Sequence, residues 1–200
     1  MKSVRTFVAL GLGAVATVAA VSTPALAQET GSARSTANQH CVLDTDNGAK
    51  SCFSTYKEAI TFGTKGRVTD APNDTRAAVR DQKLQERLSG PRNERGLKSA
   101  RGSLPAAPAE RKVLGTLYSD ADFGGGTFTY TGSVGCIRYP EFVSMGSGWN
   151  DVVSSVAGGQ CNVTLYQHSN FLGSSQTYGG GAPYVGDAMN DQASSVSFER

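Results

Sequence analysis

Two short sequence signals occur twice, in the same order, within residues 113–200. Residues 118–125 and 166–173 both run aromatic residue, four residues, phenylalanine, one residue, glycine. Further along, Asn-Asp followed by two residues and Ser-Ser occupies 150–155 and again 190–195. Because repetition of two signals in one order marks a duplicated structural unit, we expect this half of the chain to fold as two copies of one motif.

Short apolar stretches alternate with glycine clusters in the same region, at Leu114–Tyr118, Thr127–Tyr130, Val163–Tyr166 and Val196–Phe198. The chain has 24 glycines in 200 residues, nearly double the usual share of about 7%. Short strands separated by tight turns at this spacing are typical of a β-sandwich or barrel. The sequence therefore predicts an all-β domain over 113–200.

These residues resemble a βγ-crystallin domain of the microbial, calcium-binding kind. The Greek-key motif of that family is Tyr/Phe-x-x-x-x-Tyr/Phe-x-Gly, and its calcium signature is Asn/Asp-Asn/Asp-x-x-Ser/Thr-Ser. Both occur twice here without departure, and the likeness covers residues 113–200. It implies two Greek-key motifs that form a βγ-crystallin-like sandwich around one core.

The resemblance also implies two Ca²⁺ sites. Each loop would offer the side chain of its second residue, the carbonyl of its third and the hydroxyl of its fifth. The residues so assigned are Asp151, Val152 and Ser154 in the first loop, and Asp191, Gln192 and Ser194 in the second. Asn150 and Asn190 would shape the loops and are candidate further ligands. Further carbonyls are expected from the hairpin of the partner motif, within 119–122 and 167–170. The last serines, Ser155 and Ser195, resemble the structural serine that braces the hairpin.

The chemistry of these loops agrees with that assignment. Calcium is a hard cation that takes six to eight oxygen ligands, and Asn-Asp-x-x-Ser-Ser is dense in oxygens. A single Asn-Asp would be explained equally well by a turn or a helix cap, but two copies in phase with two hairpins favour cation binding. With one formal carboxylate in each loop, we expect a moderate Kd of roughly 10⁻⁴–10⁻³ M or somewhat tighter.

The first 27 residues have the pattern of a secretory leader. Lys2 and Arg5 precede an apolar run from Phe7 to Val21, and a small-x-small pattern ends at Ala27. A membrane anchor is the alternative, but the run is shorter than the roughly 20 residues that span a bilayer. We expect cleavage, secretion into the extracellular space, and no membrane association afterwards.

Export makes disulfides the default for the four cysteines. Cys41, Cys52, Cys136 and Cys161 allow three connectivities. The local pairs Cys41–Cys52 and Cys136–Cys161 are favoured because each lies within one apparent module. The spacings fit no zinc pattern.

Residues 28–112 divide into three parts. Residues 28–40 are expected to be a flexible N-terminus. Residues 41–72 are predicted to form a small module with a hairpin (41–44 and 49–52, with the turn Thr45–Gly48) and a helix from Tyr56 to about Phe62, started by a Thr55/Glu58 capping box. Residues 73–112 have few large apolar side chains and are interpreted as a linker, mostly disordered. A frayed helix within 77–88 and a basic arm for an acidic surface are the alternatives there.

Composition and motifs limit the classes of function that the sequence supports. After the leader the charge is balanced at 17 acids and 17 bases, which does not favour nucleic acid as a partner. The chain has two histidines and none of the common nucleophile-elbow, P-loop, zincin or C-x-x-C motifs, so we do not expect an enzyme. We expect a secreted calcium-binding protein whose ion stabilises the fold, with an extracellular protein partner left open. The alternative is a secreted inhibitor of extracellular (metallo)proteases, or another antagonist, on the same fold.

Overall fold

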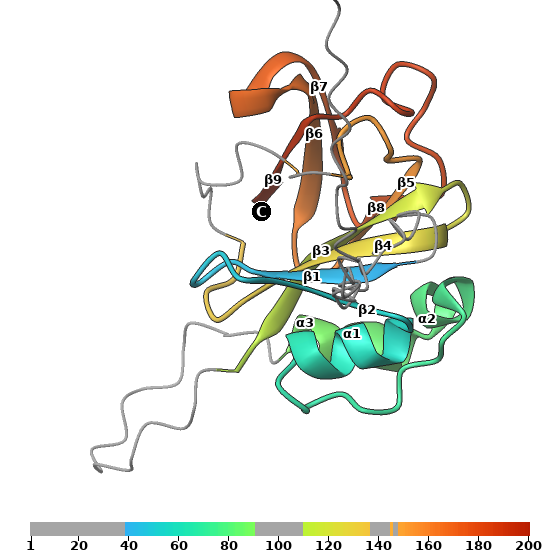
Figure 1. Ribbon diagram of the computed structural model, residues 1–200, viewed down its shortest axis with the longest axis vertical. Coiled ribbons are helices and arrows are strands. Elements are labelled where there is room, and N and C mark those ends of the chain that lie inside the picture. Colours follow the sequence, from blue (N-terminus) through green and yellow to red (C-terminus); the bar gives the residue numbers. More distant parts are fainter. Residues whose placement is uncertain (1–38, 91–109, 137–144, 146–147) are drawn as a thin grey trace, which may run out of the picture. The chain divides into compact units, whose positions relative to one another are not determined.

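The computed structural model describes residues 39–90, 110–136, 145 and 148–200 (Figure 1). All of them belong to one unit that begins at Ala33. The predicted leader (1–27), most of the predicted flexible N-terminus and residues 91–109 lie outside the described residues. Within the described part of the chain, no helix is long and apolar enough to cross a membrane.

Strands of the described residues form two sheets. The larger has the order β2-β1-β4-β3-β5-β8 and the smaller has the order β7-β6-β9. Their bounds are β1 His40–Asp44, β2 Lys50–Phe53, β3 Lys112–Asp120, β4 Gly124–Gly132, β5 Ser155–Gly158, β6 Asn162–His168, β7 Leu172–Tyr178, β8 Gly181–Ala182 and β9 Ser195–Glu199. A short 3₁₀ turn, η2 (Ser169–Phe171), joins β6 to β7. Apart from such turns and loops, the described part of 113–200 is built from strands, as the sequence predicts.

One apolar core is shared by both sheets. Leu117 and Phe128 enter it from the larger sheet, and Leu165 and Phe198 enter it from the smaller. The rings of Tyr130 and Phe198 meet across the core with their centroids 4.8 Å apart. Alternation of inward and outward side chains along each strand produces this arrangement.

The duplication extends to single hydrogen bonds. In the first copy, the hydroxyls of Thr116 on β3 and Thr129 on β4 lie 3.2 Å apart. In the second copy, Thr164 on β6 and Thr177 on β7 form the same pair at 2.8 Å. The two β-hairpins therefore have the same register as well as the same sequence signal.

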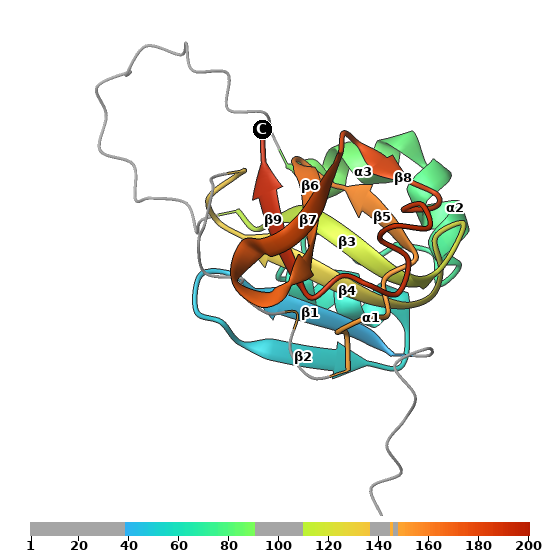
Figure 2. The ribbon, with the colours of Figure 1, turned by 90° about the horizontal axis from the view of Figure 1, so that it is seen from above.

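The N-terminal hairpin extends the larger sheet. Strand β1 pairs antiparallel with β2, as predicted, and also parallel with β4, from His40 opposite Thr127 to Asp44 opposite Thr131. Figure 2 shows β1 beside β4, with β2 at the outer edge. The N-terminal module thus adds two strands to the sheet of the C-terminal half.

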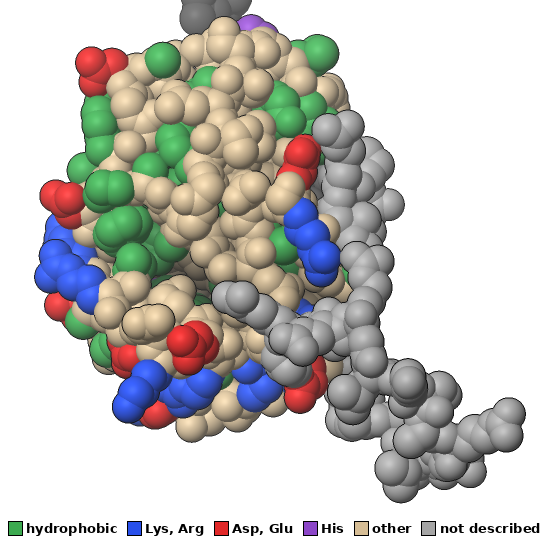
Figure 3. All heavy atoms as spheres, turned by 180° about the vertical axis from the view of Figure 1, so that it is seen from behind, with side chains coloured by type: hydrophobic (Ala, Val, Ile, Leu, Met, Phe, Trp, Pro, Cys, Tyr) green, Lys and Arg blue, Asp and Glu red, His purple; other side chains and the backbone are tan. Residues whose placement is uncertain are grey.

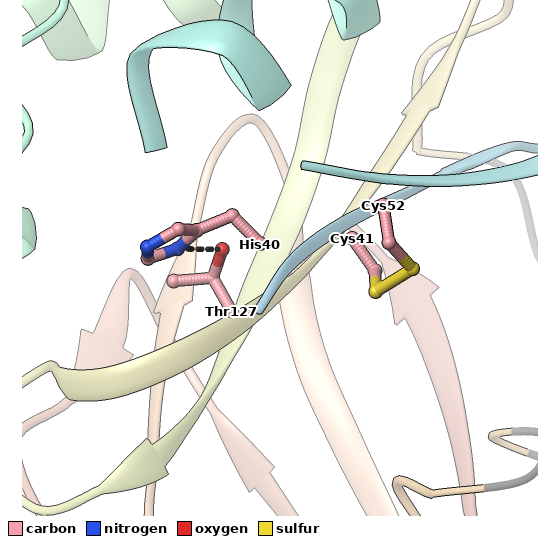
Figure 4. The surroundings of a disulfide bond; sticks show 4 residues. All are labelled: His40, Cys41, Cys52 and Thr127. Carbon is pink, nitrogen blue, oxygen red and sulfur yellow. Dashed lines mark hydrogen bonds between the residues drawn. A yellow bond between two sulfur atoms is a disulfide. The ribbon is translucent and has the colours of Figure 1, made fainter. Parts of the chain in front are cut away.

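The predicted helix and disulfides are present. Helix α1 (Tyr56–Gly63) begins at a complete capping box between Thr55 and Glu58. Cys41 is bonded to Cys52 across the β1–β2 hairpin, with a Cα–Cα distance of 4.0 Å (Figure 4). Cys136 is bonded to Cys161, with a Cα–Cα distance of 5.3 Å.

The linker interpretation is wrong for residues 75–89. Two helices, α2 (Thr75–Arg80) and α3 (Gln82–Ser89), occupy this segment, and Asp74 and Asp81 cap their first amides. Few apolar residues are present, but Leu84 and Leu88 share one face of α3 because they are four positions apart. Both are buried in a second core, whose members are Tyr56, Ile60, Val68, Ala71, Ala78, Leu84, Leu88 and Val113.

Charged side chains are unevenly distributed over the surface (Figure 3). On the face drawn in Figure 3, Lys and Arg side chains gather toward the helical end, and the surface over the strands is mostly uncharged. A largely buried ion pair joins Arg111, just before β3, to Asp44 of the N-terminal module, at the end of β1. The second carboxylate near Arg111 is that of Asp46, at 3.4 Å.

Candidate cation site in the paired loops

Both β-hairpins turn through left-handed backbone. The residues with positive φ in the turns are Asp122, Phe123 and Gly125 in the first copy, and Asn170, Phe171 and Gly173 in the second. Gly125 has a φ of 71°, which residues with a Cβ adopt only with strain, and a Cβ there would also lie against the Ser119 hydroxyl and the Asp120 carboxylate. Both motif glycines therefore stand at positions whose left-handed backbone favours glycine.

The motif aromatics pack on each other inside each hairpin. Tyr118 and Phe123 make an edge-on pair with ring centroids 5.6 Å apart, and Tyr166 and Phe171 make the same pair at 5.4 Å. These rings are part of the packing, and they hold the turn against the strand it follows.

The last serine of each loop braces a hairpin. The Ser155 hydroxyl donates to the carbonyl of Asp120 at 2.6 Å and accepts from the amide of Phe123 at 3.0 Å. The Ser195 hydroxyl does the same with the carbonyl of His168 (2.6 Å) and the amide of Phe171 (3.1 Å). The bracing role predicted for these two serines is confirmed.

The serine before the bracing serine in each loop has a different pattern of hydrogen bonds. The Ser154 amide donates to the Tyr118 carbonyl at 3.0 Å, and the Ser194 amide donates to the Tyr166 carbonyl at 2.9 Å. Each serine is 8% exposed, and within the described part of the chain neither hydroxyl makes a hydrogen bond. Each loop therefore has one serine hydroxyl that makes two hydrogen bonds and, next to it in the sequence, one serine hydroxyl that makes none within the described residues.

The loop carboxylates are exposed and held in place. Asp151 (φ 56°) and Asp191 (φ 53°) both have left-handed backbone. One carboxylate oxygen of each aspartate accepts a hydrogen bond from the side-chain amide of the preceding asparagine. The distance is 2.6 Å from Asn150 and 2.8 Å from Asn190. The asparagines thus orient the carboxylates, in keeping with the loop-shaping role predicted for them.

The two loops are joined to each other. The amide of Asp151 donates to the carbonyl of Ala193 at 3.0 Å, and the amide of Asp191 donates to the carbonyl of Val153 at 3.2 Å. Sequence reasoning treated the loops as two separate ligand sets and missed this exchange. The only available signal was the equal phase of the two loops, which suggests a pseudo-twofold axis between them.

Trp149 precedes the first loop, and Met189 stands at the same position before the second. Both are buried, and the Trp149 ring is stacked on Phe128 with a centroid distance of 5.5 Å. Trp149 is thus a packing residue. Because it is the only tryptophan of the chain, its fluorescence reports on the first loop.

The donor set determines which cation the loops fit. Across the described residues, no group of three or more His, Cys, Asp and Glu side chains is close enough to hold a metal ion. A cation bound here would depend on carbonyl, hydroxyl and single carboxylate oxygens, which are calcium ligands rather than zinc ligands. The candidate residues of each loop therefore fit calcium chemically.

The family model described as "Peptidase inhibitor family I36" matches residues 117–178, which span the first hairpin, the first loop and the second hairpin. The domain of residues 113–200 is similar to βγ-crystallin domains. Its two copies share the folded hairpin, the bracing serine and the Asn-Asp loop described above. No curated protein matches the chain.

Solved βγ-crystallin structures are similar to this domain. The βγ-crystallin domain from Clostridium beijerinckii is 26% identical, over 43% of this chain and 97% of that chain, with a TM-score of 0.34. A double mutant of the same Clostridium beijerinckii domain is 28% identical, over 44% and 97%, with a TM-score of 0.34. A βγ-crystallin from an archaeon is 21% identical, over 43% and 96%, with a TM-score of 0.33.

Proposed function

We propose that this protein is a secreted calcium-binding βγ-crystallin protein, in which two Ca²⁺ ions bind at the paired loops and stabilise the fold. The observation that carries the proposal is the contrast between neighbouring serines. Ser155 and Ser195 have both hydroxyl functions engaged, whereas the hydroxyls of Ser154 and Ser194 are left for a ligand.

The remaining ligands follow from the same loops. The carboxylates of Asp151 and Asp191 are exposed and oriented, and each is the only formal charge of its loop. Together with the serine hydroxyls and further carbonyls, the proposed ligand set is Asp151, Val152 (carbonyl), Ser154, Asp191, Gln192 (carbonyl) and Ser194, with Asn150 and Asn190 in support. Carbonyls of the hairpins at 119–122 and 167–170 would complete the shell.

We also propose that the two copies are Greek keys that exchange one strand. Strand β5 follows the first loop and pairs with β3, and strand β9 follows the second loop and pairs with β6. Strand β8 of the second copy pairs with β5 of the first. In this arrangement an ion at either loop would connect segments of both copies.

Secretion is supported by the predicted leader and by the two disulfides, which persist in oxidising compartments. In extracellular fluids calcium reaches concentrations that fill sites of moderate affinity. The proposed role of the ion is therefore to stabilise the folded protein after export.

A calorimetric titration of residues 28–200 with CaCl₂ tests the proposal. The chain should show two binding events, and Ser154→Arg and Ser194→Arg should each lose one, because the guanidinium occupies the cation position. Ser174→Arg, at an exposed position of β7, is the matched control and should keep both. A flat titration of the unsubstituted chain would overturn the proposal.

A second function is favoured by the family match. Because the model that covers residues 117–178 is named for peptidase inhibitors, inhibition of extracellular metallopeptidases is the alternative. The domain starts at Val113–Tyr118 without a cysteine, unlike the inhibitor group in which we expect paired cysteines near the first strand. Assay of the chain against a panel of such peptidases, with and without calcium, decides this: no inhibition removes the alternative for that panel.

A further inference from the structure

Helix α2 of the N-terminal module contacts the first hairpin of the βγ-crystallin domain. The hydroxyl of Thr75, the first residue of α2, donates to the carbonyl of Phe123 at 2.5 Å. Thr75 is 7% exposed, so this hydrogen bond is largely shielded from water. The helix therefore fixes the turn whose carbonyls at 119–122 are proposed calcium ligands.

The next residue of α2 brings a positive charge to the same turn. A Cβ built on Gly124 would lie 2.6 Å from Nη2 of Arg76 and 3.3 Å from Cβ of Asp120. The guanidinium and the Asp120 side chain thus flank one point at the end of the hairpin. Among the described residues, no carboxylate oxygen lies within 4.0 Å of the Arg76 guanidinium.

Among the residues that the structure describes, no helix covers the second hairpin. Leu172 occupies the position that corresponds to Gly124, and its side chain is 60% exposed. An arginine of α2 therefore lies against the glycine of the first copy, whereas the residue at the same position of the second copy is exposed among the described residues. The two copies agree at the motif positions. They differ at positions between the motif residues, such as Gly124 and Leu172.

We propose that α2 tunes the calcium site built with the first hairpin, and that Thr75 and Arg76 act on it in opposite directions. The Thr75 hydroxyl holds the Phe123 carbonyl and keeps the turn in its binding shape. The Arg76 charge repels the incoming cation. The two sites of the domain are then unequal, although their loops have the same ligand residues. This inference rests on the proposed calcium function.

The size of the charge effect follows from Coulomb's law. A unit positive charge several Å from a divalent cation, at surface dielectric and physiological salt, weakens binding by roughly three- to tenfold. Arg76→Gln should therefore tighten one of the two calcium events by that factor and leave the other unchanged. The gain should shrink in about 0.5 M NaCl, because salt screens the charge.

Two matched controls belong to this experiment. Arg80→Gln removes an exposed arginine from the last turn of the same helix and should leave both events unchanged. Arg76→Lys keeps the charge and should behave like the unsubstituted chain. Because Arg76 is exposed, none of these changes removes a buried group from the fold.

The hydroxyl is tested by Thr75→Val, which keeps the side-chain shape, and by Thr75→Ser, which keeps the donor. Thr75→Val should weaken the same event that Arg76→Gln tightens, by about three- to tenfold, for loss of one hydrogen bond. Thr75→Ser should not weaken it. Without calcium, Thr75→Val should also speed amide hydrogen exchange of residues 123–126 but not of residues 171–174.

The outcomes separate this inference from the proposed function. If the unsubstituted chain binds two ions and Arg76→Gln changes neither event, or changes no more than Arg80→Gln does, the tuning role is overturned and calcium binding stands. If the unsubstituted chain binds no calcium, the proposed function fails, and this inference fails with it. Opposite shifts of one event by Arg76→Gln and Thr75→Val support the tuning role.

Discussion

The backbone amide of Asp151 donates to the carbonyl oxygen of Ala193, and the matching bond from Asp191 to Val153 closes the exchange. Each loop therefore depends on the other for the conformation of its carboxylate residue. Both aspartates have left-handed backbone, which is costly for a residue with a Cβ, and the exchanged hydrogen bonds help to maintain it.

The exchange predicts that the two calcium sites are coupled. Ser154→Arg should abolish one binding event and also weaken the remaining event about two- to fivefold, because the distorted first loop no longer supports Asp191. Coupling of this size is usual for residues in one hydrogen-bond network. Calorimetry of Ser154→Arg and Ser194→Arg measures it, and Ser174→Arg serves as the control. A remaining event with an unchanged Kd would show that the loops act independently.

Calcium is predicted to raise the thermal stability of the chain. At about 100 times Kd, each occupied site adds about 2.7 kcal/mol to the free energy of unfolding, or roughly 5–10 °C in Tm for a domain of this size. Scanning calorimetry in CaCl₂ and in chelator measures the difference. The double variant Ser154→Arg/Ser194→Arg should show none. An equal shift with MgCl₂ would contradict selective binding by these loops.

Substitutions of the neighbouring serines Ser154 and Ser155 are predicted to change different properties, calcium binding and stability respectively. Ser155→Ala removes a buried hydroxyl that makes two hydrogen bonds, so it should lower the calcium-free free energy of unfolding by about 1–3 kcal/mol. Ser154→Ala should leave that free energy within about 0.5 kcal/mol and weaken calcium binding instead. Urea unfolding in chelator and calorimetric titration measure the two quantities. If both variants lose the same stability, the two serines do not have separate roles.

Local signals in the sequence were sufficient to predict the structural roles of the residues at the motif positions. The hairpin glycines, the bracing serines, the capping box at Thr55 and both disulfides follow from spacing and residue type, because each depends on residues that are close in the chain or repeated in phase. The same reasoning could not find the exchange between the loops, since a backbone hydrogen bond between distant residues leaves no mark on the side-chain pattern.

The N-terminal module was harder to predict for a related reason. Helix α3 has only two buried leucines among charged residues, and its stability depends on the core supplied by α1 and by Val113 of β3. The parallel pairing of β1 with β4 joins segments that are far apart in the chain, with His40 opposite Thr127. Composition alone therefore suggested a linker where tertiary packing produces two helices.

His40 is predicted to make stability depend on pH between about 7 and 5. Its ring donates to or accepts from the Thr127 hydroxyl at 3.1 Å (Figure 4), and burial lowers the pKa of His40 below its usual value of 6.5. The unfolded chain then binds the proton more readily, so stability is complete above about pH 6.5 and declines as the pH falls through the folded pKa.

Urea unfolding at pH 7 and pH 5 measures this dependence. His40→Gln should lose less stability between the two pH values than the unsubstituted chain does. His168→Gln, at the exposed second histidine, is the control and should follow the unsubstituted chain. Equal losses in all three proteins would assign the pH dependence to other groups.

The ion pair between Arg111 and Asp44 is predicted to hold the N-terminal module on the sheet. Arg111 is 7% exposed and joins the start of β3 to the end of β1. Burial by itself raises the pKa of Asp44, but hydrogen bonds from Arg111 and from the Asp46 amide, with the nearby positive charges, outweigh it, and the pKa is lowered. A lowered carboxyl pKa contributes stability that is complete above about pH 4 and is lost as the pH falls through the folded pKa.

Arg111→Met should therefore cost about 3 kcal/mol at pH 7, because it leaves the Asp44 carboxylate largely buried without its partner. Arg80→Met, on the exposed face of α2, should cost less than about 0.5 kcal/mol. Asp44→Asn should flatten the fall in stability between pH 5 and pH 2.5 relative to the unsubstituted chain. Urea unfolding at these pH values measures all three. A small cost for Arg111→Met, close to that of Arg80→Met, would mean that packing of α1 and α3, and not this ion pair, holds the module in place.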